Sequence, residues 1–336
     1  MTTLMESATA PEPGPPAREA GDLARWWQAV RTVRGALTLV VFAVVVVTAL
    51  STDGFLTASN ARAILASTAF TGLVASGLTL IMVNGNLFSL SLGSTLAVAA
   101  MVYISLLGHG LAVAVAAALV AGAAITGLQG WVIATVRANP IVVTLAGATI
   151  ANAVTARMSH GRSLTPPSGV AGYDAMSRNI AGIPISVLAM LAAALLAQLW
   201  LSRTVTGRTT FLIGTGLQAA VASGLPVTRV TTTVFGIAGI TAAIGGVMLA
   251  SFNDNASLAM SGTYNYDAIA AAVVGGAAVA GGRGSVLMTL VGALFITTVG
   301  DLVLLRGYGT GQQILAKGVI VVVFVLLTSR AGRARS

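Results

Sequence analysis

The sequence predicts an all-α, polytopic membrane protein with about ten transmembrane helices and with both termini in the cytoplasm. Composition and hydropathy carry this prediction. Of the 336 residues, 56% are hydrophobic and only 8% are charged, whereas soluble domains carry about 25% charged residues. The mean hydropathy is +0.91, and the 39 glycines fit transmembrane helices, in which glycine is frequent. Because a span needs about 20 apolar residues, the chain has room for roughly ten spans.

Ten apolar segments follow a polar N-terminal tail over 1–34, which lacks the apolar core of a cleaved signal peptide. The predicted spans lie at about 35–51, 63–83, 87–107, 111–136, 140–156, 184–201, 229–251, 267–281, 285–305 and 312–328. We therefore expect a transmembrane domain over 35–328, with its one large cytoplasmic loop at about 202–228. A short basic tail over 329–336 completes the chain.

The distribution of basic residues predicts the orientation. With the N-terminal tail in the cytoplasm, twelve of the 18 basic residues fall in cytoplasmic segments and six outside, as the positive-inside rule requires. The sequence pI of about 11.2 therefore indicates loop charge rather than a nucleic-acid partner. The excess of Arg over Lys, with abundant Ala, Val and Gly, is typical of a GC-rich bacterial genome, so we expect a bacterial plasma membrane.

Several kinds of chemistry are excluded. The chain contains no Cys, which removes disulfides, thiolate metal sites and cysteine nucleophiles. His109 and His160 fall in separate loops, and a zinc site is not expected. The sole lysine, Lys317, is followed by Gly318 and belongs to no phosphate-binding P-loop. We expect neither enzymatic activity nor a cofactor bound to this chain.

Polar side chains within the apolar segments are candidates for a translocation pathway, because burying them in a membrane is costly. They also bond helices to one another, so both interpretations stay open. The candidates are Asn84, Asn86, Gln129, Thr144 and Asn152. Their amides and hydroxyls suit an uncharged polar solute. Asp301 and Lys317 fall near the outer surface, where we expect a structural ion pair, the alternative being a pair that carries coupled protons.

The cytoplasmic loop contains a short predicted helix over 217–223. Thr215 or Gly216 can cap its start, Gly224 can end it in a left-handed conformation, and Pro226 prevents its continuation. A helix of about two turns is marginal alone. It must therefore pack on its own chain or dock on a cytoplasmic partner.

This helix resembles the coupling helix of the permease subunits of ATP-binding-cassette (ABC) importers, which reads Glu-Ala-Ala-x-x-x-Gly. Gln218, Ala219, Ala220 and Gly224 stand at the matching positions. The glutamine retains hydrogen bonding but lacks the charge of the usual glutamate.

Most of 63–328 resembles one branch of these permeases, the ribose/xylose/arabinose type. The resemblance is carried by segments 139–147, 161–163, 262–276, 280–285, 292–294 and 313–317. The family's Gly-Gly-Ile-Asp-Leu-Ser-Val-Gly-Ser motif is only half kept in 86–94. Its glycine pair is missing, and Ser89 stands at the position of the aspartate, which implies an altered substrate or a subunit that works beside a more typical permease.

The resemblance implies the ABC importer permease fold in a membrane-embedded pair of permease chains. Two cytoplasmic ATPases, which would bind the Mg-ATP, dock on the coupling helices, and a solute-binding protein delivers sugar outside. Closure of the ATPases switches the pathway between states that bind the solute differently. Tyr264, Tyr266 and Asp267 are then expected near the outer entrance, where the tyrosines either meet the sugar or its carrier or anchor the chain at the interface.

Three alternatives remain at this stage. A proton-coupled secondary transporter would use Asp267, Asp301 and Lys317. A permease of the same type could carry a nucleoside, a branched-chain amino acid or a signalling sugar. The incomplete motif around Ser89 also allows a subunit that transports nothing itself.

Overall fold

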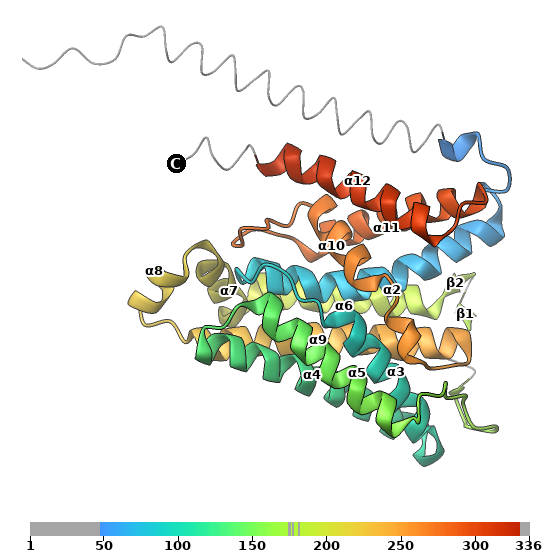
Figure 1. Ribbon diagram of the computed structural model, residues 1–336, viewed down its shortest axis with the longest axis horizontal. Helices are drawn as coiled ribbons and strands as arrows, with labels where there is room; N and C mark the ends of the chain where they lie inside the picture. Colours follow the sequence, from blue (N-terminus) through green and yellow to red (C-terminus); the bar gives the residue numbers. More distant parts are fainter. Residues whose placement is uncertain (1–47, 174–175, 177, 181, 330–336) are drawn as a thin grey trace, which may run out of the picture. The chain divides into compact units, whose positions relative to one another are not determined.

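The computed structural model describes residues 48–173, 176, 178–180 and 182–329. The predicted tail over 1–34, most of the predicted span over 35–51 and the final residues from 330 lie outside them. The part from Thr52 onward forms one compact unit and is built almost entirely of helices (Figure 1).

The helices follow one another with short connections. The long ones are α2 (Ala58–Val83), α3 (Leu92–Leu106), α4 (Leu111–Val136), α5 (Pro140–Met158), α6 (Ile185–Arg203), α9 (Val227–Asn253), α11 (Val286–Leu305) and α12 (Thr310–Ser329). The short ones are η1 (Leu107–His109), α7 (Val205–Thr215), α8 (Leu217–Ala222), η3 (Leu258–Ser261) and α10 (Tyr264–Val274). The two-residue strands β1 (Asn179–Ile180) and β2 (Ile183–Pro184) pair antiparallel before α6.

The helices agree closely with the predicted spans. Helix α4 has the predicted bounds, and α5 begins at Pro140, where the Asn139 side chain accepts the Ile141 N–H at 2.9 Å. Helix α2 begins earlier than predicted because Thr57 caps it at Ala58. Among the described residues, seven helices are long and apolar enough to cross a membrane, namely α2, α3 with η1, α4, α5, α6, α9 and α11.

Two predicted spans differ from the structure. Residues 84–91 are not helical, so α3 begins at Leu92 and not near 87. Helix α10 ends at Val274, not near 281, because the chain turns at Gly276 and again at Gly281, both with left-handed φ angles. Its 11 residues measure about 16 Å, about half of a bilayer core.

The bundle packs closely around α9, which contacts α4, α2 and α3. Small residues allow this approach. A methyl group on Gly239 would overlap the Gly122 carbonyl, and the Thr126 hydroxyl donates to the Phe235 carbonyl at 2.8 Å. Glycine and threonine at helix interfaces are typical of packing in lipid, where helices associate through close contact.

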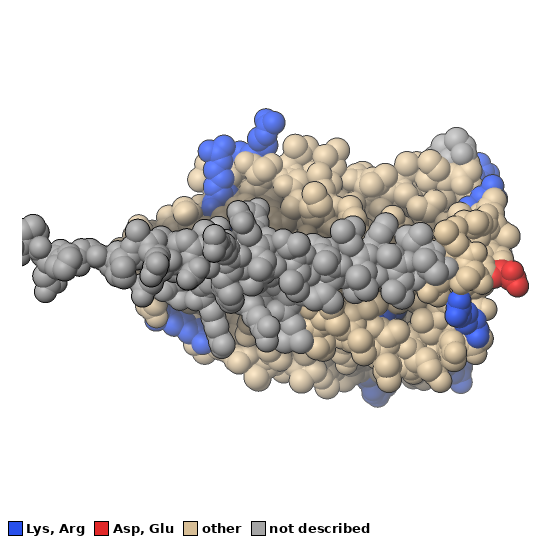
Figure 2. All heavy atoms as spheres, turned by 90° about the horizontal axis from the view of Figure 1, so that it is seen from above, with Lys and Arg blue, Asp and Glu red and all other residues tan. Residues whose placement is uncertain are grey.

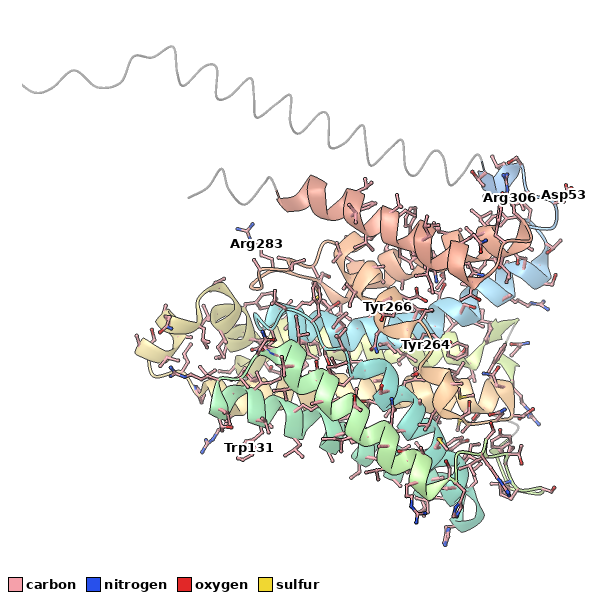
Figure 3. The ribbon with its side chains drawn as sticks, in the orientation of Figure 1. Asp53, Trp131, Tyr264, Tyr266, Arg283 and Arg306 are labelled. Atoms are coloured by element: carbon pink, nitrogen blue, oxygen red, sulfur yellow. The ribbon has the colours of Figure 1, made fainter. Side chains whose placement is uncertain are left out.

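The helices share two ends. Helices α7 and α8 lie at one end, here called the α8 end, together with the last residues of α2 and α4 and the first of α5 and α9. Arg283 lies toward the α8 end, Asp53 and Arg306 lie at the opposite end, and Tyr264 lies between them (Figure 3). On the face seen in Figure 2, Lys and Arg atoms gather mostly toward the two ends.

Candidate translocation pathway and coupling surface

Helix α8 is short, fixed at both ends and exposed. It realises the predicted helix over 217–223, with Gly216 before its first residue and Gly224 in the left-handed region at φ +71°. The Gly224 N–H donates to the Val221 carbonyl at 3.0 Å and the Leu225 N–H to the Ala220 carbonyl at 3.1 Å. This is the Schellman pattern of helix ends.

The side chains of α8 face away from the bundle. Of its six residues only Ala220 is buried. The apolar residues Leu217 and Val221, one turn apart, are 48% and 42% exposed. The predicted docking residues Gln218 and Ala219 are also exposed. The helix therefore does not obtain its stability by packing its apolar side chains into this chain.

Helix α7 connects α8 to the bundle through a contact between backbones. Gly214, in its last turn, lies against Val83 and Gly282 so closely that a methyl group would overlap the Val83 carbonyl. The Gly282 N–H donates to that same carbonyl at 3.0 Å. Gly281 touches both Gly85 and Gly214. The Gly282–Gly284 stretch is thus part of the turn after α10, and this turn contacts both α7 and the end of α2.

A cavity of about 770 Å³ opens at the α8 end. Asn84 and Asn86, both predicted pathway residues, line it, and so do Arg137 and Arg229. The buried Asn84 donates its amide to Thr231 Oγ1 at 2.9 Å, while its Oδ1 has no partner among the described residues. The cavity wall therefore includes cationic side chains and an asparagine whose buried acceptor has no partner among the described residues.

Further along the chain, side chains from two other helices hold the non-helical segment 84–91. The Leu90 N–H donates to Thr144 Oγ1 on α5 at 3.2 Å. The Ser91 hydroxyl donates to Gln129 Oε1 on α4 at 2.6 Å. The hydroxyl oxygens of Ser89 and Ser91 lie 3.0 Å apart. The predicted residues Ser89 and Thr144 thus meet in one polar cluster.

Asn265 completes this cluster, and the sequence reasoning missed it. Its Nδ2 donates to the Leu90 carbonyl at 2.9 Å and its Oδ1 accepts the Gly93 N–H at 2.7 Å. The first turn of α10 is thereby tied to the start of α3. The signal available in the sequence was the position of Asn265, a polar amide between two tyrosines at the start of an apolar helix.

Asn152 is separate from this cluster. Its Nδ2 donates to Ser94 Oγ on α3 at 3.2 Å, and its buried Oδ1 has no partner among the described residues. It joins α5 to α3 at the residue that follows Gly93.

A second cavity, of about 450 Å³, lies toward the opposite end. Tyr264 and Asp267 line it, together with Thr71, Asp301 and Lys317. The predicted neighbour Tyr266 does not line it, and its side chain is 64% exposed. Tyr266 instead lines a neighbouring pocket of about 210 Å³ that shares Asp267 and Lys317 with the second cavity. The two tyrosines expected at one entrance therefore face different pockets on either side of Asp267.

The predicted ion pair between Asp301 and Lys317 is wrong. Lys317 donates to Asp267 Oδ1 at 2.8 Å, and Asp301 accepts the Asn60 amide at 2.8 Å. The reason is that α11 has a glycine at the point where the Lys317 side chain crosses it. The Lys317 Cε lies 3.0 Å from the position that a Cβ on Gly300 would occupy. The side chain can therefore cross α11 and reach α10.

These features define a polytopic, helical membrane protein with broken helices, polar cavities at both ends and an exposed capped helix at one end. Comparisons with known proteins are consistent with this. Residues 60–328 match the family described as the branched-chain amino acid transport system / permease component. The chain belongs to this permease family.

The relatives are named for related transport systems. The chain is 30% identical over 289 residues to the ribose import permease protein of Bacillus subtilis (strain 168), covering 85% of this chain and 89% of the relative. It is 30% identical to that of Escherichia coli (strain K12), over 82% and 87% of the two chains. It is 28% identical to the autoinducer 2 import system permease protein of Escherichia coli (strain SMS-3-5 / SECEC), over 76% and 79%. No solved structure matches.

Family membership settles the coarse function. The chain is a permease component of a transport system and an integral membrane protein that crosses a bacterial membrane several times.

Proposed function

We propose that this chain is the membrane-spanning subunit of an ATP-driven ABC importer for a sugar of the monosaccharide class. The exposed helix α8 carries this proposal. A six-residue helix is too short to be stable alone, and here its apolar residues Leu217 and Val221 lack cover from their own chain. A cytoplasmic ATPase, which would bind the Mg-ATP, supplies that cover by docking on Gln218, Ala219, Ala220 and Gly224.

The contact between α7 and α2 supports α8 as the element that transmits force. A displacement of α8 acts on α7, and Gly214 of α7 lies against Val83 and Gly85. Segment 84–91 begins there. Because these are contacts between backbones, no side chain can absorb the displacement by changing rotamer. Motion imposed at α8 therefore reaches the polar cluster around Ser89 and Thr144.

The proposed topology has ten spans with both termini in the cytoplasm. Helix α10 with the loop before it, α12 and the segment over 35–51 add three spans to the seven apolar helices. The described residues carry five arginines at the α8 end, namely Arg137, Arg203, Arg208, Arg229 and Arg283, and five at the other. The tails 1–34 and 329–336 therefore decide the bias that places the α8 end in the cytoplasm.

The proposed cargo is a sugar delivered by a solute-binding protein on the outer side, with a second permease chain completing the pathway. Two relatives are ribose import permeases, and the polar cluster consists of uncharged amides and hydroxyls. Secondary transport would instead need Asp267, Asp301 and Lys317 to exchange protons. The ion pair of Lys317 with Asp267 and the hydrogen bond of Asp301 with Asn60 favour structural roles for them.

Cross-linking from α8 tests the docking proposal. The chain has no natural Cys, so Gln218→Cys introduces a single thiol that a thiol-to-amine cross-linker can use in native membranes. We expect capture of an ABC ATPase, identified by mass spectrometry. Tyr308→Cys, which is exposed at the opposite end, is the matched control and should not capture it. An ATPase captured equally from both positions, or from neither, would contradict the proposal.

A further inference from the structure

We infer that the backbone of Asn86–Ser89 forms one wall of the solute pathway and presents hydrogen-bond donors to a neutral, polyhydroxylated solute. This inference rests on the proposed function and adds the position of the solute. It concerns the backbone between α2 and α3, which is not helical over 84–91 although a transmembrane helix was expected from about 87.

The segment lies within the depth of the membrane. Its Ser91 end is bonded to Gln129, which is seven residues, or about 10 Å, from the end of α4 at Val136. Leu90 and Gly93, on either side of Ser91, are bonded to Asn265. Asn265 lies about 15 Å along α10 from the turn at Gly275. The segment thus rises from the α8 end toward the middle of the bundle.

Three successive backbone donors in this segment are unpaired. Within the described parts of the chain, the N–H groups of Leu87, Phe88 and Ser89 donate to no protein group. By contrast, the N–H groups on either side, of Asn86 and Leu90, are both bonded. An unpaired N–H in hydrocarbon costs several kcal/mol, so lipid cannot be what faces these groups.

The segment runs from the cavity into the bundle and is held in place. Asn86 lines the cavity of about 770 Å³, the next residue, Leu87, is 41% exposed, and Ser89 at the inner end is buried. Thr144, Gln129 and Asn265 fix the far end of the segment from three different helices. Non-helical backbone at membrane depth occurs where it is buried in protein or lines a water-filled cavity, and the exposure of Leu87 favours the cavity.

The chemistry of the wall selects the class of solute. The segment offers the solute a row of backbone N–H donors. The side chains that hold the segment in place are neutral hydroxyls and amides. The charged residues Arg137 and Arg229 lie at the cavity by the α8 end, where the segment begins. Hydroxyl oxygens of a sugar or other polyol accept from such donors without the desolvation cost of an ion.

Thiol accessibility tests the wall. In the complex in native membranes, Leu87→Cys should react with a small, charged, water-soluble methanethiosulfonate, because the reagent needs a hydrated thiolate. Leu196→Cys on α6, at a position where the native leucine is 67% exposed, is the matched control and should stay unmodified in lipid. We expect modification at 87 at least tenfold faster. Equal rates at the two positions would contradict the proposal that this backbone lines the pathway. So would a Leu87→Cys variant that forms a disulfide-linked dimer and resists the reagent.

Protection tests the solute class on the same variant. A mixture of D-ribose, D-xylose and L-arabinose should slow the modification of Leu87→Cys, whereas potassium chloride of equal osmolarity should not. Labelling that is unchanged by the sugars would overturn the solute class. Failure of the ATPase to cross-link at Gln218→Cys would instead count against the proposed function, because that test does not involve residue 87.

Discussion

At the scale of single residues, side chains in the bundle mostly supply hydrogen bonds that the backbone or another buried group requires. Asn265 bonds the Leu90 carbonyl and the Gly93 N–H, and Gln198 accepts the Val286 N–H at the start of α11. The buried pair of Lys317 and Asp267 has the same character, with Thr263 Oγ1 donating to the other carboxylate oxygen at 2.9 Å. These bonds satisfy groups that lipid cannot.

Lys317→Met should destabilise the protein by about 3–5 kcal/mol, because it leaves the Asp267 carboxylate buried without its cation. The double variant Lys317→Met, Asp267→Asn should recover most of that loss, since no uncompensated charge remains. Arg62→Met, an exposed position, serves as the control. Thermal denaturation in detergent, followed by fluorescence-detected size exclusion, measures all three, and a single variant no less stable than the double would contradict the structural role.

At the scale of elements, the glycine contacts determine how the helices meet. The turn between α10 and α11, the last turn of α7 and the end of α2 come together at Gly281, Gly214 and Gly85. No other residue type permits this approach, because an added methyl group would overlap backbone atoms that cannot rotate away. The connection from α8 to segment 84–91 therefore depends on one contact between backbones.

Gly214→Ala should lower stability by about 1–3 kcal/mol through this overlap. Gly236→Ala in α9 is the matched control, because its new methyl group would meet nothing closer than 4.0 Å and replaces glycine inside a helix, which favours folding. The two midpoints of thermal denaturation should thus move in opposite directions. If both substitutions move the denaturation midpoint in the same direction, the backbone contact at Gly214 is not as close as the structure describes.

At the scale of the whole molecule, the two ends of the bundle differ in what they offer. The α8 end carries arginines, a cavity and the exposed helix. All the described acidic residues, Asp53, Asp254, Asp267 and Asp301, lie toward the opposite end. There, the loop after α5 is attached to the loop after α9 by backbone bonds between Leu164 and Ala256 and by Tyr173 donating to Asp254 at 3.0 Å.

The proposed topology predicts the labelling of single cysteines in intact cells. Ser163→Cys, in the loop after α5, should react with a membrane-impermeant maleimide. Ser202→Cys, at the α8 end, should react only after the cells are made permeable, and tags on either terminus should be cytoplasmic. Both serines are exposed, so accessibility within the protein is matched. Labelling of Ser202→Cys in intact cells, or an external tag, would exclude the ten-span arrangement.

Composition and local patterns sufficed for the class of protein, for most helix bounds and for helix α8. Apolar length and capping residues are properties of neighbouring positions, so Thr57, Pro140 and Gly224 could be interpreted without a fold. The same patterns predicted the break at 84–86, but they could not locate its continuation over 87–91 or the break after Val274, because both segments are apolar enough to resemble helix. Their departure from helix depends on glycine turns that meet other backbones.

The sequence by itself therefore determined that this is a multi-span membrane protein with a short, capped helix in the loop over 202–228, and its motifs indicated a permease. The tertiary structure decided which polar groups meet. It paired Lys317 with Asp267 and not Asp301, it brought the unnoticed Asn265 onto Leu90 and Gly93, and it separated Tyr266 from the cavity of Tyr264. The physical reason is that partners distant in the chain are chosen by which helix faces touch, and those contacts depend on close packing at glycines such as Gly300 and Gly214.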